Sequence, residues 1–350
     1  MARSVANSAS SPSKKSTAKS PATSKAAATK PAATKATASK KGTVKSSKTA
    51  KPTKAKGVKS KAVELESKAV EPKKSTTAKK KPAASTSSKA IKSETVRSWY
   101  DYPELYEMGF LKETPQEADF LTDAFEKYVP FPVKSVLEAG CGSGRLICEM
   151  AGRGYSMTGL DLNPTALKYC KKKLKKDKNK ANLVVGDMTQ FSFDQPFDAA
   201  VNAINTFRHL ESEEAALAHL NCVADHLKTG GIFVLSLHLL PRGSDLWGTE
   251  RWSAKSDDVS VHYALTVVET SLKTRLEKLR ISMLVKKQDE KFRLSDHITL
   301  RIYTVKQLKE LLDKCVKLKL IAVHDFWYDI DNTQKLNADA CDTVLILQKV

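Results

Sequence analysis

The first 98 residues of the 350-residue chain contain no Phe, Trp or Tyr. They consist mostly of Lys, Ala, Ser, Thr and Pro, and so offer too little apolar surface to offset the conformational entropy lost on folding. Residues 1–92 hold 24 Lys and Arg against three acids, a net charge of +21, which leaves −1 for residues 93–350. We therefore expect a disordered basic tail over residues 1–92 and a folded domain over residues 93–350.

The composition of the tail fits three roles. It resembles a solvated polyelectrolyte that aids solubility, a polycation that contacts nucleic-acid phosphates without sequence preference, and a Ser/Thr/Ala-rich organelle transit peptide. Because residues 93–350 are nearly neutral, the sequence does not indicate a basic face spread over the folded domain.

Cysteine pairs and long apolar runs are also missing. The six cysteines are widely spaced and form no Cys-x-x-Cys pair, which argues against a disulfide framework and a zinc site and fits a reducing compartment. The longest apolar run, residues 231–240, is far shorter than the roughly 18 residues of a membrane span, and the N-terminus lacks the apolar core of a secretory signal. We expect a soluble intracellular protein, cytoplasmic or nuclear or nucleoid, without a metal and without membrane contact.

Strand and helix patterns alternate between residues 135 and 240. Short apolar strands are expected at residues 135–138, 156–160, 182–185, 197–203 and 232–237. Helices are expected at residues 144–151, 164–174 and 212–227, the last closed by Lys228 and the glycines at 230 and 231, and an earlier helix begins at Pro115. This alternation predicts a parallel sheet covered on both faces.

A different pattern begins after residue 250. Apolar and polar residues alternate over residues 259–267, 279–285 and 298–302, which is typical of half-exposed antiparallel strands. A helix at residues 305–315 and a strand pair at 318–328 and 343–347 complete the chain. We predict a doubly wound, mostly parallel seven-stranded α/β sheet with a core over residues 133–240, inserted antiparallel strands over 255–303 and a closing helix and strand pair over 304–350.

Glycines gather between the first strand of this sheet and the following helix. The segment Glu138-Ala139-Gly140-Cys141-Gly142-Ser143-Gly144 allows a tight turn, lets a ligand approach the backbone, and presents the unpaired N–H groups of a helix N-terminus. The dinucleotide fingerprint Gly-x-Gly-x-x-Gly would need glycine at position 145, where Arg145 stands.

Acidic and apolar residues end the next strands. Asp161 lies 21 residues past Gly140 at the end of the second strand, where two carboxylate oxygens can accept both hydroxyls of a ribose. Asp187 and Met188 end the third strand, where they can pair with an adenine amino group and cover its ring. Asn202 ends the fourth strand, in the crevice where open α/β sheets bind ligands.

These motifs together resemble the class I S-adenosylmethionine-dependent methyltransferases, in a branch that acts on small molecules. The sequence motifs of this branch occur nearly intact over residues 99–350. In chain order they are Leu-Glu-x-x-Cys-Gly-x-Gly-Arg-Leu, Gly-Asp-Met, Phe-Arg-His-Leu, and Gly-Gly followed by His-Leu. The resemblance implies that the glycine loop holds the methionine portion of the cofactor, Asp161 the ribose, and Asp187 with Met188 the adenine. The cofactor-binding residues expected on this basis are Glu138, Gly140, Cys141, Gly142, Gly144, Asp161, Leu162, Asp187, Met188 and Asn202. A domain for another nucleotide and a cofactor-binding domain without catalysis are the alternatives.

Candidate catalytic residues follow from their position. Methyl transfer from a sulfonium releases a neutral leaving group, so the orientation of the two reactants supplies most of the rate enhancement. A general base is needed only when the methyl acceptor arrives protonated. Arg208 and His209 follow the fourth strand and His238 ends the fifth, and each is also a candidate for a structural role. Lid or substrate contacts are expected from Tyr100, Tyr102, Tyr106, Asn205, Trp252 and Arg301.

Several motifs that are missing from the sequence narrow the range of methyl acceptors. The absence of Asn-Pro-Pro-Tyr and Asp-Pro-Pro-Tyr disfavours adenine methylation in nucleic acid, and the absence of Pro-Cys disfavours cytosine C5 methylation. We expect a small-molecule acceptor that is methylated on N or O. The alternative is a nucleic-acid- or chromatin-associated protein that is localised by its tail.

Overall fold

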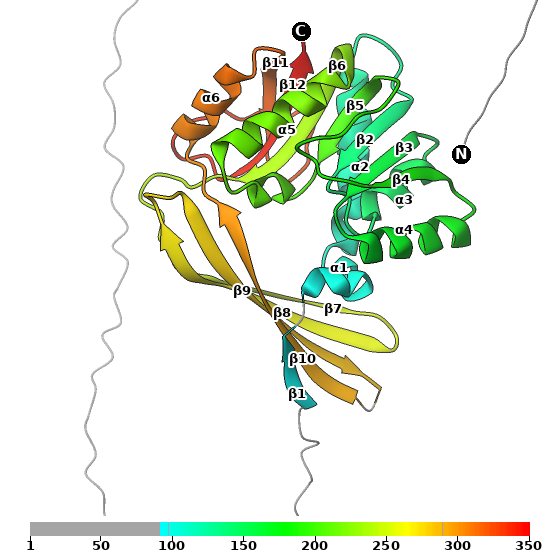
Figure 1. Ribbon diagram of the computed structural model, residues 1–350, viewed down its shortest axis with the longest axis vertical. Coiled ribbons are helices and arrows are strands. Elements are labelled where there is room, and N and C mark those ends of the chain that lie inside the picture. The colour runs from blue at the N-terminus through cyan, green and yellow to red at the C-terminus, as the bar shows by residue number, and fades with distance from the viewer. Residues whose placement is uncertain (1–91, 97, 289) are drawn as a thin grey trace, which may run out of the picture. The chain divides into compact units, whose positions relative to one another are not determined.

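The computed structural model describes residues 92–96, 98–288 and 290–350 (Figure 1). The tail expected over residues 1–92 therefore lies outside the described residues, except for Lys92. Within the described part of the chain, no helix combines the length and the apolar character needed to cross a membrane.

A seven-stranded sheet forms the core, in the strand order β11-β12-β6-β5-β2-β3-β4. Strands β2 to β6 pair in parallel, whereas β12 runs antiparallel to both of its neighbours. The strands are β2 (Ser135–Ala139), β3 (Ser156–Asp161), β4 (Ala181–Val185), β5 (Phe197–Asn202), β6 (Leu227–His238), β11 (Leu318–His324) and β12 (Asp342–Lys349). The predicted mostly parallel α/β sheet is confirmed.

Helices cover both faces of this sheet. On one face, α5 (Glu213–Asp225) and α6 (Val305–Lys314) pack on a core that includes Phe233 and Leu345. On the other face, α2 (Thr114–Tyr128), α3 (Arg145–Gly152) and α4 (Pro164–Lys176) pack on Val136 and Ile346. Alternate residues of each buried strand point to opposite faces, so near-continuous apolar strands supply both cores.

A second sheet has the order β1-β10-β9-β8-β7. Its strands are β1 (Lys92–Val96), β7 (Thr249–Lys255), β8 (Val259–Ser271), β9 (Leu276–Lys287) and β10 (Glu290–Arg301). The inserted antiparallel strands are confirmed, but a further strand, β7, lies ahead of residue 255, where the insertion was expected to begin. Strand β1 was not predicted, because its Lys-Ser-Glu-Thr-Val sequence has no apolar alternation; it forms by parallel pairing with β10.

Short helices lie between the two sheets: η1 (Trp99–Asp101), α1 (Pro103–Met108) and η2 (Leu111–Glu113) (Figure 1). Trp99 and Leu105 share an apolar cluster with Met283 of the second sheet, and Tyr263 Oη donates a hydrogen bond of 2.6 Å to the Leu105 carbonyl. The second sheet thereby fixes residues 99–110, which we call the aromatic segment, against the edge of the first sheet at which β2 and β3 end.

One predicted helix end is wrong. Helix α5 ends at Asp225, and the glycines at 230 and 231 lie inside β6 rather than after a helix. A Cβ at Gly231 would lie 2.5 Å from the Asp198 carbonyl oxygen, so the close approach of β6 to β5 requires glycine there.

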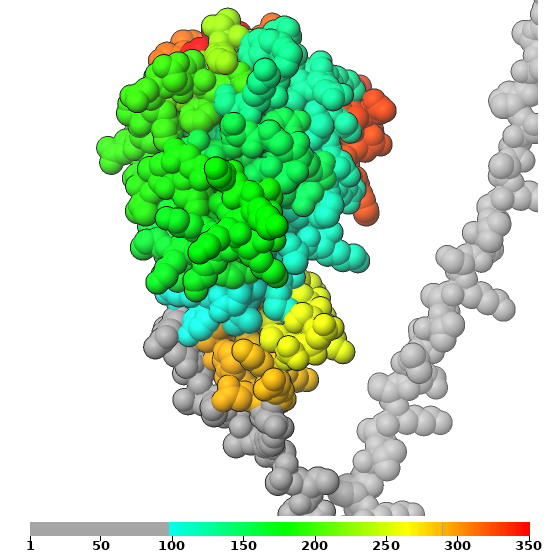
Figure 2. All heavy atoms as spheres, turned by 90° about the vertical axis from the view of Figure 1, so that its right-hand side faces the viewer, coloured from blue at the N-terminus to red at the C-terminus, as the bar shows by residue number. Residues whose placement is uncertain are grey.

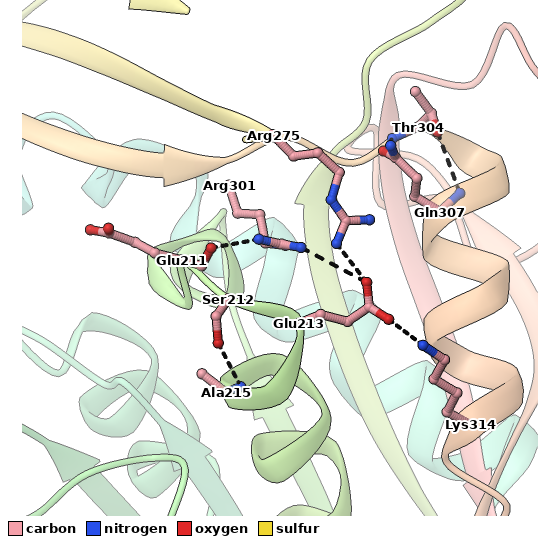
Figure 3. A network of polar contacts seen from close by, with 9 residues as sticks. All are labelled: Glu211, Ser212, Glu213, Ala215, Arg275, Arg301, Thr304, Gln307 and Lys314. Atoms are coloured by element: carbon pink, nitrogen blue, oxygen red, sulfur yellow. Dashed lines mark hydrogen bonds and ion pairs between the residues drawn. The ribbon is translucent and has the colours of Figure 1, made fainter. Parts of the chain in front are cut away.

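An ionic network joins the second sheet to the helices of the core (Figure 3). Glu213, in the first turn of α5, accepts from Arg275 Nη2 at 2.6 Å and also pairs with Lys314 of α6. Arg301, at the end of β10, donates to the Glu211 carbonyl at 2.5 Å and lies 3.9 Å from the Glu213 carboxylate. This network ties the β9 and β10 ends of the second sheet to α5 and α6.

Candidate active site

A cavity of about 330 Å³ opens at the carboxyl ends of β2 and β3, beneath the aromatic segment. Parallel α/β sheets bind their ligands at this edge. The lining residues are Ser98, Tyr100, Pro103, Tyr106, Gly140, Gly142, Ser143, Asp161, Leu162, Asn163, Ala166, Gly186, Met188, Ile204, Thr206 and His209.

The glycine loop forms one wall of the cavity. Gly140, Gly142 and Gly144 all have positive φ, at 75°, 51° and 71°. A Cβ on Gly142 would have no heavy atom within 4 Å and would point into open space, whereas a Cβ on Gly140 would lie 2.3 Å from Thr206 Cγ2. Gly140 and Gly144 thus permit packing of the loop, while Gly142 keeps its backbone open to a ligand.

Asp161 fixes the shape of this loop. One carboxylate oxygen accepts from the Gly142 N–H at 2.7 Å and the other accepts from the Asn163 N–H at 2.8 Å. Burial raises the pKa of Asp161, and the two backbone hydrogen bonds oppose that shift. The carboxylate lines the cavity, and each of its oxygens retains lone pairs that a hydroxyl could reach.

Two polar side chains lie beneath the loop and outside the lining. Asn202 is fully buried, and its amide donates to the Ala139 carbonyl at 3.0 Å, while its Oδ1 has no partner among the described residues. Glu138 is 4% exposed, and its Oε2 likewise has no hydrogen bond within the described part of the chain. Burial raises the pKa of Glu138 to about 8, Arg145 opposes the shift and Glu117 adds to it.

Apolar side chains also line the cavity. Met188 and Ile204 line the cavity, as does Leu162, whose side chain is 69% exposed. Asp187 is not part of the lining, and its Oδ1 accepts from both the N–H and the hydroxyl of Thr189, each at 2.8 Å. Cys141 and Gly144 are also not among the lining residues.

A histidine and a tyrosine meet at the cavity wall. His209, at the end of η3 (Thr206–His209), forms a hydrogen bond of 3.0 Å between its Nε2 and Tyr100 Oη. Burial and the charge of Arg208 lower the pKa of His209 to about 4, so the ring is neutral at neutral pH. Burial raises the pKa of Tyr100 well above its usual value and that of Tyr106 to about 12, so both hydroxyls stay protonated.

The other two catalytic candidates lie elsewhere. His238 and Arg208 line a second cavity of about 490 Å³, together with Asn205. Arg208 is engaged with Glu277 and donates to the Arg301 carbonyl at 2.9 Å, and the His238 Nδ1 lies 3.1 Å from the Asp342 carboxylate. The structure thus brings His209, but neither Arg208 nor His238, to the cavity with the glycine loop.

Besides Asn205, three more of the expected lid residues lie outside the first cavity. Trp252 stacks on Tyr263 with 5.0 Å between ring centroids, Arg301 belongs to the network of Figure 3, and Tyr102 does not line the cavity. Residues that the sequence prediction omitted line it instead: Ser98, Pro103, Ser143, Asn163, Ala166, Gly186, Ile204 and Thr206. Most of these are neighbours of predicted residues on the same turns, so extending each motif by one or two positions would have found them.

Comparison with known proteins identifies the central part of the chain. Residues 136–231 match the family described as a methyltransferase domain. The chain therefore contains a methyltransferase domain. The prediction of a methyltransferase that uses S-adenosylmethionine is confirmed.

Relatives of this methyltransferase domain span different shares of the chain. A candidate methyltransferase of Geobacillus sp. (strain WCH70) is 21% identical over 236 residues, which cover 67% of this chain and 92% of that protein. The dTDP-3-amino-3,4,6-trideoxy-alpha-D-glucopyranose N,N-dimethyltransferase of Streptomyces venezuelae is 27% identical over 138 residues, which cover 39% of this chain and 56% of that protein.

Solved structures share the fold across the folded part of the chain. An S-adenosylmethionine-dependent methyltransferase from Clostridium acetobutylicum has a TM-score of 0.60 at 17% identity, and the match covers 72% of this chain and 99% of that chain. An amino pentose methyltransferase from Micromonospora echinaspora has a TM-score of 0.58 at 18% identity, with 74% and 100% covered. At these identities the likeness establishes the fold.

Proposed function

We infer that the chain transfers a methyl group from S-adenosylmethionine to a nitrogen or oxygen atom of a small molecule. The observation that carries this inference is the cavity of about 330 Å³ in which the glycine loop, Asp161 and the pair formed by His209 and Tyr100 lie together. Its size is at the lower end of the range for small-molecule sites, which is roughly 300 to 1,000 Å³.

The residues around the cavity fit the parts of the cofactor. Gly142 leaves room for a ligand against its backbone, and Asp161 presents carboxylate lone pairs that suit a ribose diol. Met188, Ile204 and Leu162 supply an apolar surface that suits a flat base. When bound, S-adenosylmethionine supplies an electrophilic methyl group on a sulfonium.

His209 and Tyr100 are proposed to hold the acceptor and take its proton. An amine or hydroxyl acceptor loses a proton as its new bond to carbon forms. Because Tyr100 stays protonated, its Oη can donate to His209 Nε2 and at the same time accept a hydrogen bond from the acceptor. The neutral imidazole can then receive a proton through the tyrosine hydroxyl.

A small acceptor is favoured by the aromatic segment over the cavity. Tyr100, Tyr106 and Pro103 come from η1 and α1, and Trp99 fixes this segment on the second sheet. Such a cover encloses a small molecule more readily than a polymer. The names of relatives that methylate amino sugars point the same way.

The charge of residues 1–92 favours a second candidate function. A net charge of +21 suits a methyltransferase that is held at nucleic acid or chromatin and acts on a macromolecule there.

One experiment separates the two candidates. The full chain is incubated with S-adenosylmethionine labelled in the methyl group and with a fractionated cell extract. Label in the small-molecule fraction supports the proposed acceptor class, and label confined to protein or nucleic acid contradicts it.

Two variants test the proposed catalytic pair. His209→Ala and Tyr100→Phe should both lower kcat by about 10²- to 10⁴-fold, the usual contribution of a positioned acid or base. His262→Ala, which alters an exposed histidine on β8, is the matched control and should retain activity. Unchanged kcat in both active-site variants would remove the pair from the mechanism.

A further inference from the structure

Helix α4 carries an unusual concentration of positive charge. Residues 164–180 contain eight lysines and a single acid, Asp177. The chain from residue 93 to 350 has a net charge of only −1, so its overall neutrality conceals a strongly basic local surface. Figure 2 views the molecule from the side on which α4 lies in Figure 1, and green spheres, the colour of this part of the chain, cover much of the left and centre of the facing surface.

The lysines lie on the solvent face of α4 because the other face is used for packing. Ala166, Leu167, Cys170 and Leu174 are buried, and Lys173 pairs with Glu107 at 2.6 Å. The remaining seven lysines are exposed, and within the described part of the chain none of them takes part in an ion pair. We call them the α4 lysine patch: Lys168, Lys171, Lys172, Lys175, Lys176, Lys178 and Lys180.

The helical positions place five of these lysines along one stripe. Positions 168, 171, 172, 175 and 176 follow the i, i+3, i+4, i+7, i+8 spacing of a single helix face. At 1.5 Å per residue the stripe is about 12 Å long, a length over which duplex nucleic acid carries about seven negative charges. Like charges at this density repel one another, and a polyanion relieves the repulsion while releasing its own counterions.

We propose that the α4 lysine patch binds the phosphate backbone of nucleic acid without sequence preference. Protein interfaces are depleted in lysine and built around apolar or aromatic residues, whereas the exposed residues of α4 after its first turn are all lysines. Side chains of this kind contact phosphates and carry no base readout. The tail brings a second polycation to the same chain, with 24 Lys and Arg against three acids over residues 1–92.

The helix that carries the patch begins at the candidate active site. Helix α4 begins at Pro164, directly after Asn163, and both Asn163 and Ala166 line the cavity. The nucleic acid is a binding partner in this proposal and need not be the methyl acceptor. Its binding is therefore independent of the proposed catalytic function, and either proposal can fail alone.

The test compares two fourfold variants of the full chain. The patch variant replaces Lys171, Lys172, Lys175 and Lys176 with Gln, which removes charge but preserves helix propensity. The control variant makes the same exchange at exposed lysines outside α4: Lys286, Lys287, Lys309 and Lys319. Both variants have the same net charge, and calorimetry with S-adenosylmethionine checks that each one still binds the cofactor.

Affinity is measured by fluorescence anisotropy, with a labelled DNA duplex of arbitrary sequence, over a series of salt concentrations. The patch variant should bind roughly tenfold or more weakly at low salt, and its slope of log affinity against log salt should be shallower by about 2 to 4, near 0.9 per lost phosphate contact. The control variant should retain most of the affinity and slope of the parent.

Three results would overturn the proposal. The first is a patch variant with unchanged affinity and slope, and the second is an equal loss in both variants, which would assign binding to net charge and the tail. The third is unchanged DNA binding combined with loss of binding to polyglutamate, which would point to an acidic protein partner.

Discussion

Glu138 offers the sharpest test of the site's electrostatics. It lies beneath the glycine loop, 4% exposed, with one carboxylate oxygen lacking a partner among the described residues. Burial raises its pKa from 4.5 to about 8, so the folded protein keeps a proton that the unfolded chain releases between these two values. Exchange to glutamine, which is isosteric and uncharged, should remove this linkage.

The sign and size of the effect of Glu138 on the free energy of unfolding follow from the two pKa values. Below pH 4.5 both states are protonated and Glu138 adds no pH dependence. As the pH rises toward 8, the carboxyl group lowers the free energy of unfolding, because the folded state binds more protons than the unfolded state. At 1.36 kcal/mol per pKa unit, the full shift amounts to on the order of 3 to 5 kcal/mol.

Urea unfolding of the full chain at several pH values from about 4.5 to 8 measures this effect. The Glu138→Gln variant should gain stability over the parent as the pH rises, and the gain should be largest at the upper end of this range. Glu126→Gln on α2, an exposed position, is the control and should follow the parent at every pH. Parallel curves for Glu138→Gln and the parent would refute the assignment of a buried, protonated carboxyl group.

Three further outcomes are expected. Asp161→Ala should weaken S-adenosylmethionine binding, measured by calorimetry, by about 1 to 3 kcal/mol, because the loop and the ribose both lose a hydrogen-bond acceptor. Unaltered affinity would mean that Asp161 does not bind the ribose. Gly142→Ala should also weaken cofactor binding, because alanine is strained at this positive φ and its Cβ points into the cavity. Gly243→Ala, also at positive φ but outside the cavity, is the control and should leave the affinity unchanged. In the Glu138→Gln background, stability should fall as the pH drops from 6.5 toward 4, because burial lowers the pKa of His209 and of His219 to about 4 and only the unfolded chain binds those protons; a flat profile would contradict both shifts.

The order of strands and helices was largely predictable because the residues that form them repeat with clear periods. Buried parallel strands are apolar throughout, and glycine or proline marks the turns between them. The exceptions have physical causes: Gly230 and Gly231 serve a close strand approach rather than a helix end, and β1 depends on its partner strand instead of its own composition.

The sequence determined which turns contribute residues to the candidate site. The carboxyl ends of parallel strands meet at one edge of the sheet, however the side chains pack. The sequence indicated the glycine loop, Asp161 and Met188, and all three line the cavity. Tertiary structure alone decided which side of each turn faces the ligand. Arg208 and His209 are adjacent in sequence, yet successive residues of η3 point in different directions, so one lines the second cavity and the other the first. The run of eight lysines over residues 164–180 is readable in the sequence, but only the structure shows that seven of them are exposed and that five lie along one face of α4.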